Sequence, residues 1–249
     1  MKIALLADLH ANLEAVTACL DHAGREGYDR LAFLGDLVGY GADPVAVLEL
    51  VMERARAGAL VVRGNHDDAA LEEEADEGMN PSAKRAAAWT RTQLGPHHRE
   101  FLSNLPFLLR EEGMLLVHGS ALAPEKHEYV TDARGAAMSL GSSKGATWVL
   151  SGHVHEPALY FAAGGGRPVA FKPVPGVVIP VPSRRQWLAI VGSSGQPRDG
   201  NTAACYAVLD LARAVLTFHR VPYDWSAAAR KIRDAGLPER LAVRLETGE

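Results

Sequence analysis

Side chains that bind metal ions recur at five places in the first 155 residues, each after a short apolar run. Carboxylate, amide and neutral imidazole donors suit manganese, iron and zinc, and no thiolate is present to select a softer ion. A lone Asp-x-His or His-Gly is usually structural, but five such motifs together predict a metal site. The motifs are Asp8-Leu9-His10, Gly35-Asp36, Gly64-Asn65-His66-Asp67, His118-Gly119 and Gly152-His153-Val154-His155.

These donors are sufficient for two divalent ions that share one carboxylate. In two-metal sites the ions lie roughly 3.5–4 Å apart. Asp36 is the best candidate for the shared ligand because small Gly35 precedes it. We expect manganese first, with iron or zinc as alternatives, because all three accept this donor set. The other ligands divide into Asp8, His10 and His155 for one ion and Asn65, His118 and His153 for the second.

His66 is not needed as a ligand and is expected to act as a general acid. Two metal ions lower the pKa of a water that they share, and the hydroxide formed attacks phosphorus without a serine or cysteine nucleophile. His66 follows the ligand Asn65 and is therefore placed to protonate the leaving alkoxide. We expect Asp67 to orient His66 and to raise its pKa.

Alternating elements in the first 65 residues are predicted to position these side chains. Residues 2–7, 31–34 and 59–62 are apolar strands, and helices begin near Asn12 and after Asp43-Pro44. This β-α-β-α-β order predicts parallel strands with right-handed crossovers. Each motif comes just after a predicted strand, and ligands bind beyond the carboxyl ends of strands in open α/β sheets.

The remaining chain changes from helical to β-rich. Residues 68–112 are predicted to be mostly helical, with one helix capped by Asn80-Pro81 and ending at Gly95, and 115–117 and 147–150 are strands. The runs 159–162, 169–172, 186–191, 204–209 and 215–220 are typical of antiparallel hairpins, and 225–245 is helical with a break at 236–238. The Pro-rich segment 172–182 is predicted to be an extended arm or edge hairpin.

Composition limits the class of protein. With 249 residues, 47% of them hydrophobic, and no long linker, we expect a single domain over 1–249. The net charge of −4 gives no strong nucleic-acid signal, and no apolar run approaches the ~20 residues of a membrane span. Cys19 and Cys205 are predicted to be buried small hydrophobic residues, and the cytoplasm is the expected location. A homo-oligomer remains open.

The five motifs in this order resemble the calcineurin-like metallophosphoesterase superfamily, whose pattern is DxH, GD, GNH[D/E], H, GHxH. The resemblance implies a mixed α/β and α+β fold, a four-layer β-sandwich flanked by helices. It also implies the ligand assignment above, with His66 as the acid, and a small phosphate ester as the substrate. Residues 35–44, 192–201 and 220–224 further resemble a bacterial and archaeal branch of phosphoesterases and phosphodiesterases.

One difference from other members of the family bears on the substrate. Protein Ser/Thr phosphatases and symmetric dinucleoside tetraphosphatases carry an arginine after the GD motif that clamps phosphate, where this chain has Gly39-Tyr40-Gly41. We therefore expect a phosphodiesterase. A phosphomonoesterase, a dinucleoside polyphosphate hydrolase, a nuclease and a non-catalytic metal-binding scaffold are the alternatives. The candidates for a cation that binds phosphate in place of the missing arginine are Arg198, in a Gly-rich loop, and Arg63, just before Gly64.

Other polar residues admit two interpretations each. Asn12 caps the first helix or contacts substrate, and the cap is favoured; Tyr40 stacks on a leaving group or packs under its loop. Arg198 contacts substrate or belongs to a tight turn. The acidic run 72–77 is a solvated face or a lid. The histidines outside the motifs are predicted to be exposed or hydrogen-bonded: His22, His97, His98, His127 and His219.

Overall fold

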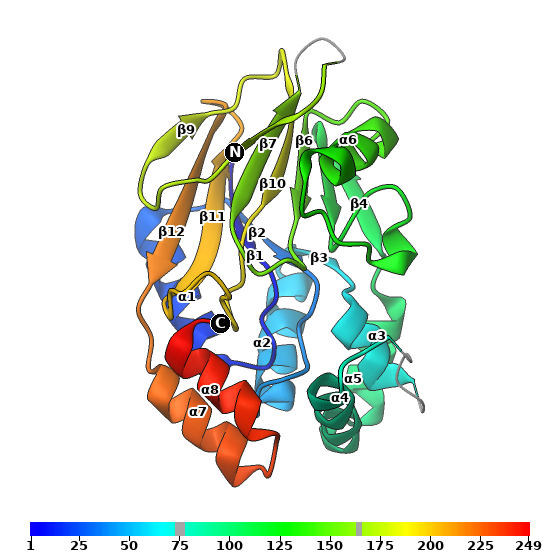
Figure 1. The fold of residues 1–249 in the computed structure, drawn as a ribbon, viewed down its shortest axis with the longest axis vertical. Helices are drawn as coiled ribbons and strands as arrows, with labels where there is room; N and C mark the ends of the chain where they lie inside the picture. The colour runs from blue at the N-terminus through cyan, green and yellow to red at the C-terminus, as the bar shows by residue number, and fades with distance from the viewer. Residues whose placement is uncertain (73–77, 163–165) are drawn as a thin grey trace.

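The structure is a computed structural model that describes residues 1–72, 78–162 and 166–249. The described strands form two six-stranded sheets (Figure 1). The first sheet consists of β1 (Lys2–Leu6), β2 (Arg30–Leu34), β3 (Leu60–Val62), β9 (Val178–Pro180), β11 (Ala204–Asp210) and β12 (Val215–Val221). Its order is β3-β2-β1-β11-β12-β9, with β1, β2 and β3 parallel as predicted.

The second sheet is mixed. It consists of β4 (Leu108–Glu111), β5 (Met114–Val117), β6 (Trp148–Ser151), β7 (Ala158–Ala162), β8 (Val169–Phe171) and β10 (Gln186–Ile190). Its order is β4-β5-β6-β10-β7-β8. The β7–β8 and β11–β12 pairs are antiparallel hairpins as expected, but β10 pairs parallel with β6 on one side and antiparallel with β7 on the other.

Helices cover the outer faces and one end of the sheets (Figure 1). Asn12 caps α1 through its side chain, whereas the Asp43 carboxylate makes no capping bond to α2 and instead accepts a hydrogen bond from Lys231. The helices are α1 (Leu13–Glu26), α2 (Pro44–Arg56), α3 (Asn65–Leu71), α4 (Pro81–Gln93), α5 (Pro96–Asn104), α6 (Ala133–Ser142), α7 (Trp225–Asp234) and α8 (Glu239–Thr247), with a 3-10 turn η1 (Pro124–Lys126).

Alternation along the strands builds the layers. In β1, Ile3 and Leu5 pack into the core between the two sheets, while Ala4 and Leu6 face the core beneath the helices. A separate apolar cluster, which includes Val149 and Leu188, lies between the second sheet and α6. The result is the predicted order of helix, sheet, sheet and helix, which confirms the expected fold class.

One sequence expectation needs correction. Residues 108–111 form the edge strand β4, although this segment falls within the region predicted to be mostly helical. The helix predicted to start at Asn80-Pro81 and stop at Gly95 is α4, which ends at Gln93, and Gly95 caps the next helix α5. Most of the acidic run, residues 73–77, lies outside the described residues. The Pro-rich segment supplies β9, which lies at a sheet edge as predicted but pairs with the distant strand β12, so it does not form the hairpin that one interpretation expected.

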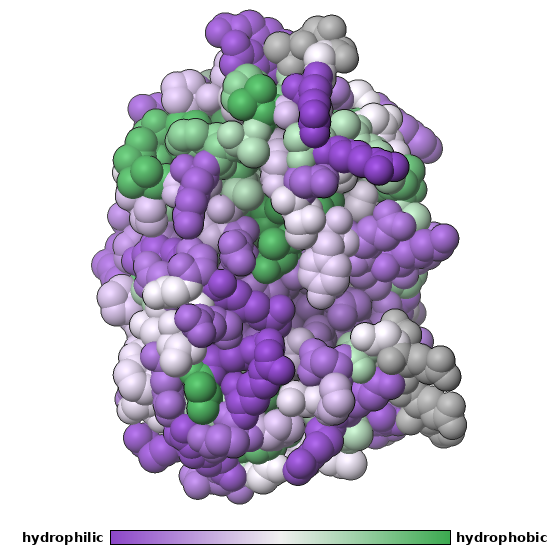
Figure 2. All heavy atoms as spheres, viewed as in Figure 1, coloured by the Kyte–Doolittle hydropathy of each residue, from purple (hydrophilic) through white to green (hydrophobic). Residues whose placement is uncertain are grey.

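Exposed apolar side chains gather near the two edge strands β8 and β9. Val169, Phe171, Val174, Val177 and Val178 are each 43–57% exposed. Figure 2 shows green apolar surface at the upper left, over β9. No helix in the described part of the chain is both long enough and apolar enough to cross a bilayer.

Candidate metal centre

Five strand ends bring the predicted ligands to one edge of the two sheets. Asp8 follows β1, Asp36 follows β2, and Asn65 opens α3 after β3. From the second sheet, His118 follows β5, and the segment with His153 follows β6. Backbone hydrogen bonds connect these loops to one another. For example, Asp8 N–H in the loop after β1 donates to Gly35 O in the loop after β2 at 3.1 Å.

The loops are held in a conformation that non-glycine residues rarely adopt. Positive φ angles occur at five of the seven predicted ligands, and such backbone is retained where surrounding contacts enforce it, typically at functional sites. There is no space for larger residues beside them: a Cβ added to Gly64 would lie 2.2 Å from Asp36 Oδ1. The five φ angles are 52° at Asp8, 46° at His10, 52° at Asp36, 68° at His153 and 66° at His155.

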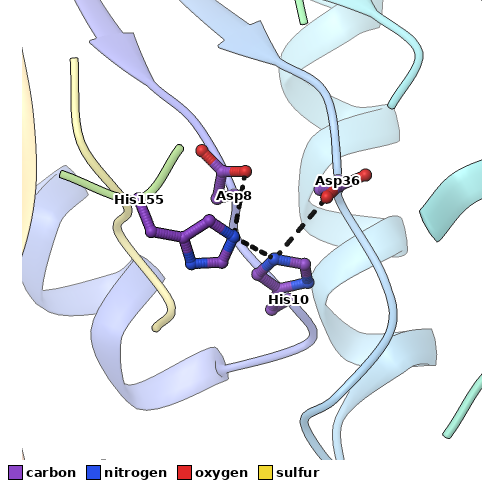
Figure 3. Close-up of side chains that lie close together, drawn as sticks. All are labelled: Asp8, His10, Asp36 and His155. Atoms are coloured by element: carbon purple, nitrogen blue, oxygen red, sulfur yellow. Dashed lines mark hydrogen bonds and ion pairs between the residues drawn. The ribbon is translucent and has the colours of Figure 1, made fainter. Parts of the chain in front are cut away.

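The first cluster consists of Asp8, His10, Asp36 and His155, whose donor atoms all lie within 4.8 Å of one another. Figure 3 shows the His10 and His155 rings facing each other between the two carboxylates. The two Nε2 atoms are 3.1 Å apart, and His155 Nε2 is 3.4 Å from Asp8 Oδ1. All four residues are at most 2% exposed. This is a closed cage of nitrogen and oxygen donors.

The second cluster consists of Asp36, His118 and His153, with the Asn65 amide beside it. His118 Nε2 lies 3.3 Å from Asp36 Oδ2, 3.0 Å from His153 Nδ1 and 3.2 Å from Asn65 Oδ1. Asp36 is therefore common to both clusters, as the sequence predicted for a shared carboxylate. The Nε2 atom of His153 is buried and has no hydrogen-bond partner among the described residues.

Backbone carbonyls fix the tautomer of three ligand rings. The Nδ1 atoms of His10, His118 and His155 lie 3.2, 2.8 and 2.6 Å from the carbonyl oxygens of Val38, Leu34 and Gln196. A ring that donates through Nδ1–H presents an unprotonated Nε2 to the cluster, which is the usual supporting contact of a metal-binding histidine. These contacts preorganise the rings before an ion binds.

Burial and mutual charge set the protonation of the clusters. Burial raises the pKa of Asp8 to about 7, and the Asp36 charge adds to this. Burial opposes ionisation of Asp36 too, but the surrounding histidines, His118 first, hold its pKa well below the usual range. Burial, the largest single influence, lowers the pKa of His118, yet the charge of Asp36 and its contact with the ring, together with the Asp8 charge and the Leu34 carbonyl, outweigh burial and raise that pKa to about 10. Without a cation, a proton on His118 neutralises Asp36.

The donor set fits a binuclear divalent-metal site. Two carboxylates, four imidazoles and one amide converge on two adjacent points, and His10 and His155 have pKa values lowered well below normal, chiefly by burial, so they are neutral ligands. Buried carboxylates grouped this closely need a cation nearby. The mixture of nitrogen and oxygen donors and the absence of sulfur both suit divalent ions of intermediate hardness.

His66 lies beside both clusters, but Asp67 does not contact it as expected. The Asp67 carboxylate accepts hydrogen bonds from the backbone N–H groups of Leu37, Val38 and Gly64 at 2.9–3.2 Å and thereby joins the second and third motifs. His66 instead packs edge-on to His10 and against Tyr40. Burial lowers the pKa of His66 to about 4, which is opposite in direction to the rise expected from Asp67.

The three proposed substrate contacts occupy different places. Asn12 accepts from Ala15 N–H as the cap of α1 and donates to Gly195 O at 2.7 Å, so its side chain is fully engaged. Tyr40 is buried, with its ring centroid 4.3 Å from that of His66. Arg198 reaches over Tyr40, donates to Gln196 Oε1, and has a buried Nε with no hydrogen-bond partner among the described residues.

Several cleft residues were missed by sequence reasoning. A cleft of about 750 Å³ is lined by His66, Asn65 and His153 together with His127 and Tyr129. His127 is buried and donates through Nε2 to Asp68 at 2.9 Å, so it is hydrogen-bonded as predicted. Its position in the cleft lining was not predicted. No local sequence signal marks Tyr129, because its partner His153 lies in a different loop, after β6.

Comparison with known proteins agrees with this site. Residues 1–214 match the family described as the calcineurin-like phosphoesterase superfamily domain. The match spans most of the chain and includes all five motifs, so the protein belongs to this superfamily.

Similar proteins extend the match to the whole chain. An uncharacterized protein of Methanocaldococcus jannaschii is 32% identical over 251 residues, covering 99% of this chain and 98% of the relative. The crystal structure of a metallophosphoesterase from Sphaerobacter thermophilus is 35% identical with a TM-score of 0.85, covering 100% of this chain and 99% of that one. A hypothetical protein from Pyrococcus horikoshii OT3, 23% identical, has the same fold, with a TM-score of 0.80 and coverage of 100% and 98%.

Proposed function

We propose that this protein is a dinuclear-metal-dependent phosphoester hydrolase that prefers phosphodiesters. The observation that carries the proposal is the pair of clusters sharing Asp36, with His66 beside them in a cleft of about 750 Å³. A metal-binding scaffold would not need an intact set of donors together with His66. We propose manganese as the working metal, with iron or zinc as alternatives that the same donors accept.

Bound metal ions would act as Lewis acids that polarise the phosphoryl group and acidify water, and Asp8, His10, Asp36, Asn65, His118, His153 and His155 would hold them. The protein's own contribution is to fix these donors before substrate binds. His66 N–H donates to Asp36 Oδ1 at 2.8 Å, so the backbone of the proposed acid is anchored to the shared carboxylate. Asp67 supports the same loop through its backbone contacts.

His66 needs a proton before it can act as an acid, since burial gives it a pKa of about 4. An anionic phosphate in the cleft favours the protonated ring, because opposite charges at close range stabilise each other. We propose that His66 takes up its proton as substrate binds and transfers it to the leaving oxygen. Contacts with His10 and Tyr40 keep the ring oriented in the meantime.

The small number of cations near the clusters in the described part of the chain supports the preference for diesters. We propose that Arg198 binds the phosphate, and this residue comes from the loop after β10 instead of from the segment after Asp36. The segment after Asp36 carries Leu37, Val38 and Gly39, which provide no charge. A diester bears one negative charge and needs less cationic compensation than a monoester dianion.

Manganese-reconstituted protein tests the proposal with an aryl diester and an aryl monoester. We expect a higher kcat/KM for the diester, and His66→Gln is expected to lower kcat roughly 10²–10⁴-fold, the usual contribution of a general acid. His97→Gln is the matched control, because His97 is exposed and pairs only with Glu49 and neighbouring His98 among the described residues. Absence of hydrolysis of both esters with manganese, iron and zinc would contradict the proposal.

A further inference from the structure

We propose that Tyr129 is a specificity-determining residue that stacks on a planar aromatic leaving group. The inference rests on the proposed function, since it names the class of ester that the same site accepts. Tyr129 lies in the loop between η1 and α6, and its ring stacks on that of the ligand His153 with centroids 3.7 Å apart and planes at 20°. One face of the ring is thus covered by a side chain of the second cluster.

The rest of the Tyr129 side chain is available to a ligand. The residue is 59% exposed and lines the cleft that also contains His66. An exposed aromatic ring fixed beside a reactive centre is unusual for packing alone, because a core tyrosine would be buried. His66, the proposed proton donor, lines the same cleft. A leaving group protonated by His66 therefore departs into the cleft that Tyr129 lines.

The loop that carries Tyr129 is held firmly. Ser120 N–H donates to Glu128 O at 3.0 Å, and a Cβ on Gly119 would lie 2.8 Å from the same oxygen. His127 donates to Asp68, and Asp68 is also paired with Arg63 at 3.1 Å. Tyr129 is therefore a preorganised surface, and stacking on it requires little additional ordering of the protein.

The remaining lining favours an uncharged ring over a polyanion. A volume of about 750 Å³ lies within the ~300–1,000 Å³ typical of small-molecule sites and leaves room beyond the phosphate. Away from the clusters, the described lining contains Met79 and the carboxylates of Glu72 and Glu125 against the single amine of Lys126, whereas the Asp68 carboxylate is paired with Arg63 and His127. Additional phosphates on the leaving group would meet these carboxylates, whereas a neutral ring would not.

Binding of non-hydrolysable phosphonates to the manganese-loaded protein tests this inference without catalysis. Two pairs of probes differ only by an aromatic group: phenylphosphonate against methylphosphonate, and the methylenephosphonate analogue of adenosine monophosphate against that of ribose phosphate. We expect at least one aromatic member to bind about tenfold more tightly than its partner, the scale of one stacking contact. The first pair reports a simple aryl group and the second a nucleoside.

Tyr129→Leu is expected to remove most of that difference, and Tyr129→Phe to retain it. Metal content must equal that of the wild type, because Tyr129 also covers His153. An unchanged aromatic preference in Tyr129→Leu, an equal loss for both members of a pair, or no preference in the wild type would each overturn the inference. Failure of the proposed function would give a different result: the wild-type protein would hydrolyse neither ester, and the difference in phosphonate binding could still be measured.

Discussion

The two metal clusters share Asp36 but differ in their surroundings. In the first cluster, His10 and His155 are each tied to a backbone carbonyl and are at most 2% exposed. In the second, His118 is likewise buried and tied to a backbone carbonyl, but Asn65 and His153 line the cleft, and His153 Nε2 has no partner among the described residues. One half of the centre is closed, and the other faces the space where a substrate would enter.

This difference suggests a division of roles between the clusters. Rings held by carbonyls on the closed side keep their donors in place, as supporting hydrogen bonds generally do for metal ligands. The open side adjoins His66, His127 and Tyr129, the residues that line the cleft. We infer that the closed cluster mainly retains its ion, whereas the open cluster meets the phosphate. The following changes test that comparison, from the largest expected effect to the smallest.

Replacing the shared carboxylate should affect both clusters at once. Asp36→Asn removes the charge that both ions require, and removing one member of a buried charge pair costs about 3–5 kcal/mol, or on the order of 10²–10⁴ in affinity. We expect loss of both ions in elemental analysis. Asp210→Asn, at a buried aspartate in β11 outside the clusters, is the control. Retention of one ion at wild-type affinity would show that Asp36 serves only one cluster.

Metal affinity should rise with pH. Without metal, His118 has a pKa of about 10, because its contacts with Asp36, Asp8 and the Leu34 carbonyl together outweigh burial, and burial gives Asp8 a pKa of about 7. Each proton displaced by an ion makes affinity rise about tenfold per pH unit. For the product of the two ions' affinities, the slope should therefore approach two decades per unit well below pH 7 and fall to one above it. Calorimetry in buffers of different ionisation enthalpy measures the released protons, and a flat profile from pH 6 to 8 would refute this scheme.

The two ions should leave at different rates. With a chelator in excess, we expect one ion to dissociate about tenfold more slowly than the other, the scale on which supporting contacts change metal binding. His153→Ala should remove the fast phase and preserve the slow one, while His155→Ala should do the reverse. Stopped-flow measurement of metal release distinguishes the phases. A single phase in the wild type would mean that the closed and open sides do not differ in retention.

The smallest change concerns the wall of the closed side. Asn12→Ala removes the cap of α1 and the bond to Gly195 O, next to the Gln196 carbonyl that orients His155. The free energy of unfolding should fall by about 1–2 kcal/mol. Asp132→Ala removes only the exposed cap of α6 and should cost about 1 kcal/mol or less. Denaturant titration measures the free energy of unfolding of both variants. Equal losses would show that Asn12 acts only as a helix cap and does not support the site.

Local sequence patterns are sufficient to predict the closed side of the metal centre. Three short apolar runs with helical patterns between them predict the parallel strands β1, β2 and β3, and ligands at strand ends then meet at one edge. The open side depends on distant neighbours. Spacing places Asp67 beside His66 but cannot reveal that its carboxylate points to Leu37 and Gly64.

Residues of the cleft wall show the same limit. Tyr129 reaches its partner His153 from another loop, and His127 meets Asp68, which lies 59 residues away in the sequence. Nothing in the local pattern around 124–129 distinguishes these residues from an ordinary surface turn. Edge strand β4 was missed for a related reason, because Leu108–Glu111 is short, follows helical segments, and gains its conformation by pairing with β5.

The most direct test of the account is a manganese titration of the metal-free protein in which bound metal and hydrolysis of an aryl diester are followed together. Two clusters sharing Asp36 predict two ions per chain, with little activity at the first equivalent and a rise to a plateau as the second is bound. Saturation at one ion per chain with full activity, or saturation at two ions without hydrolysis, would contradict the account.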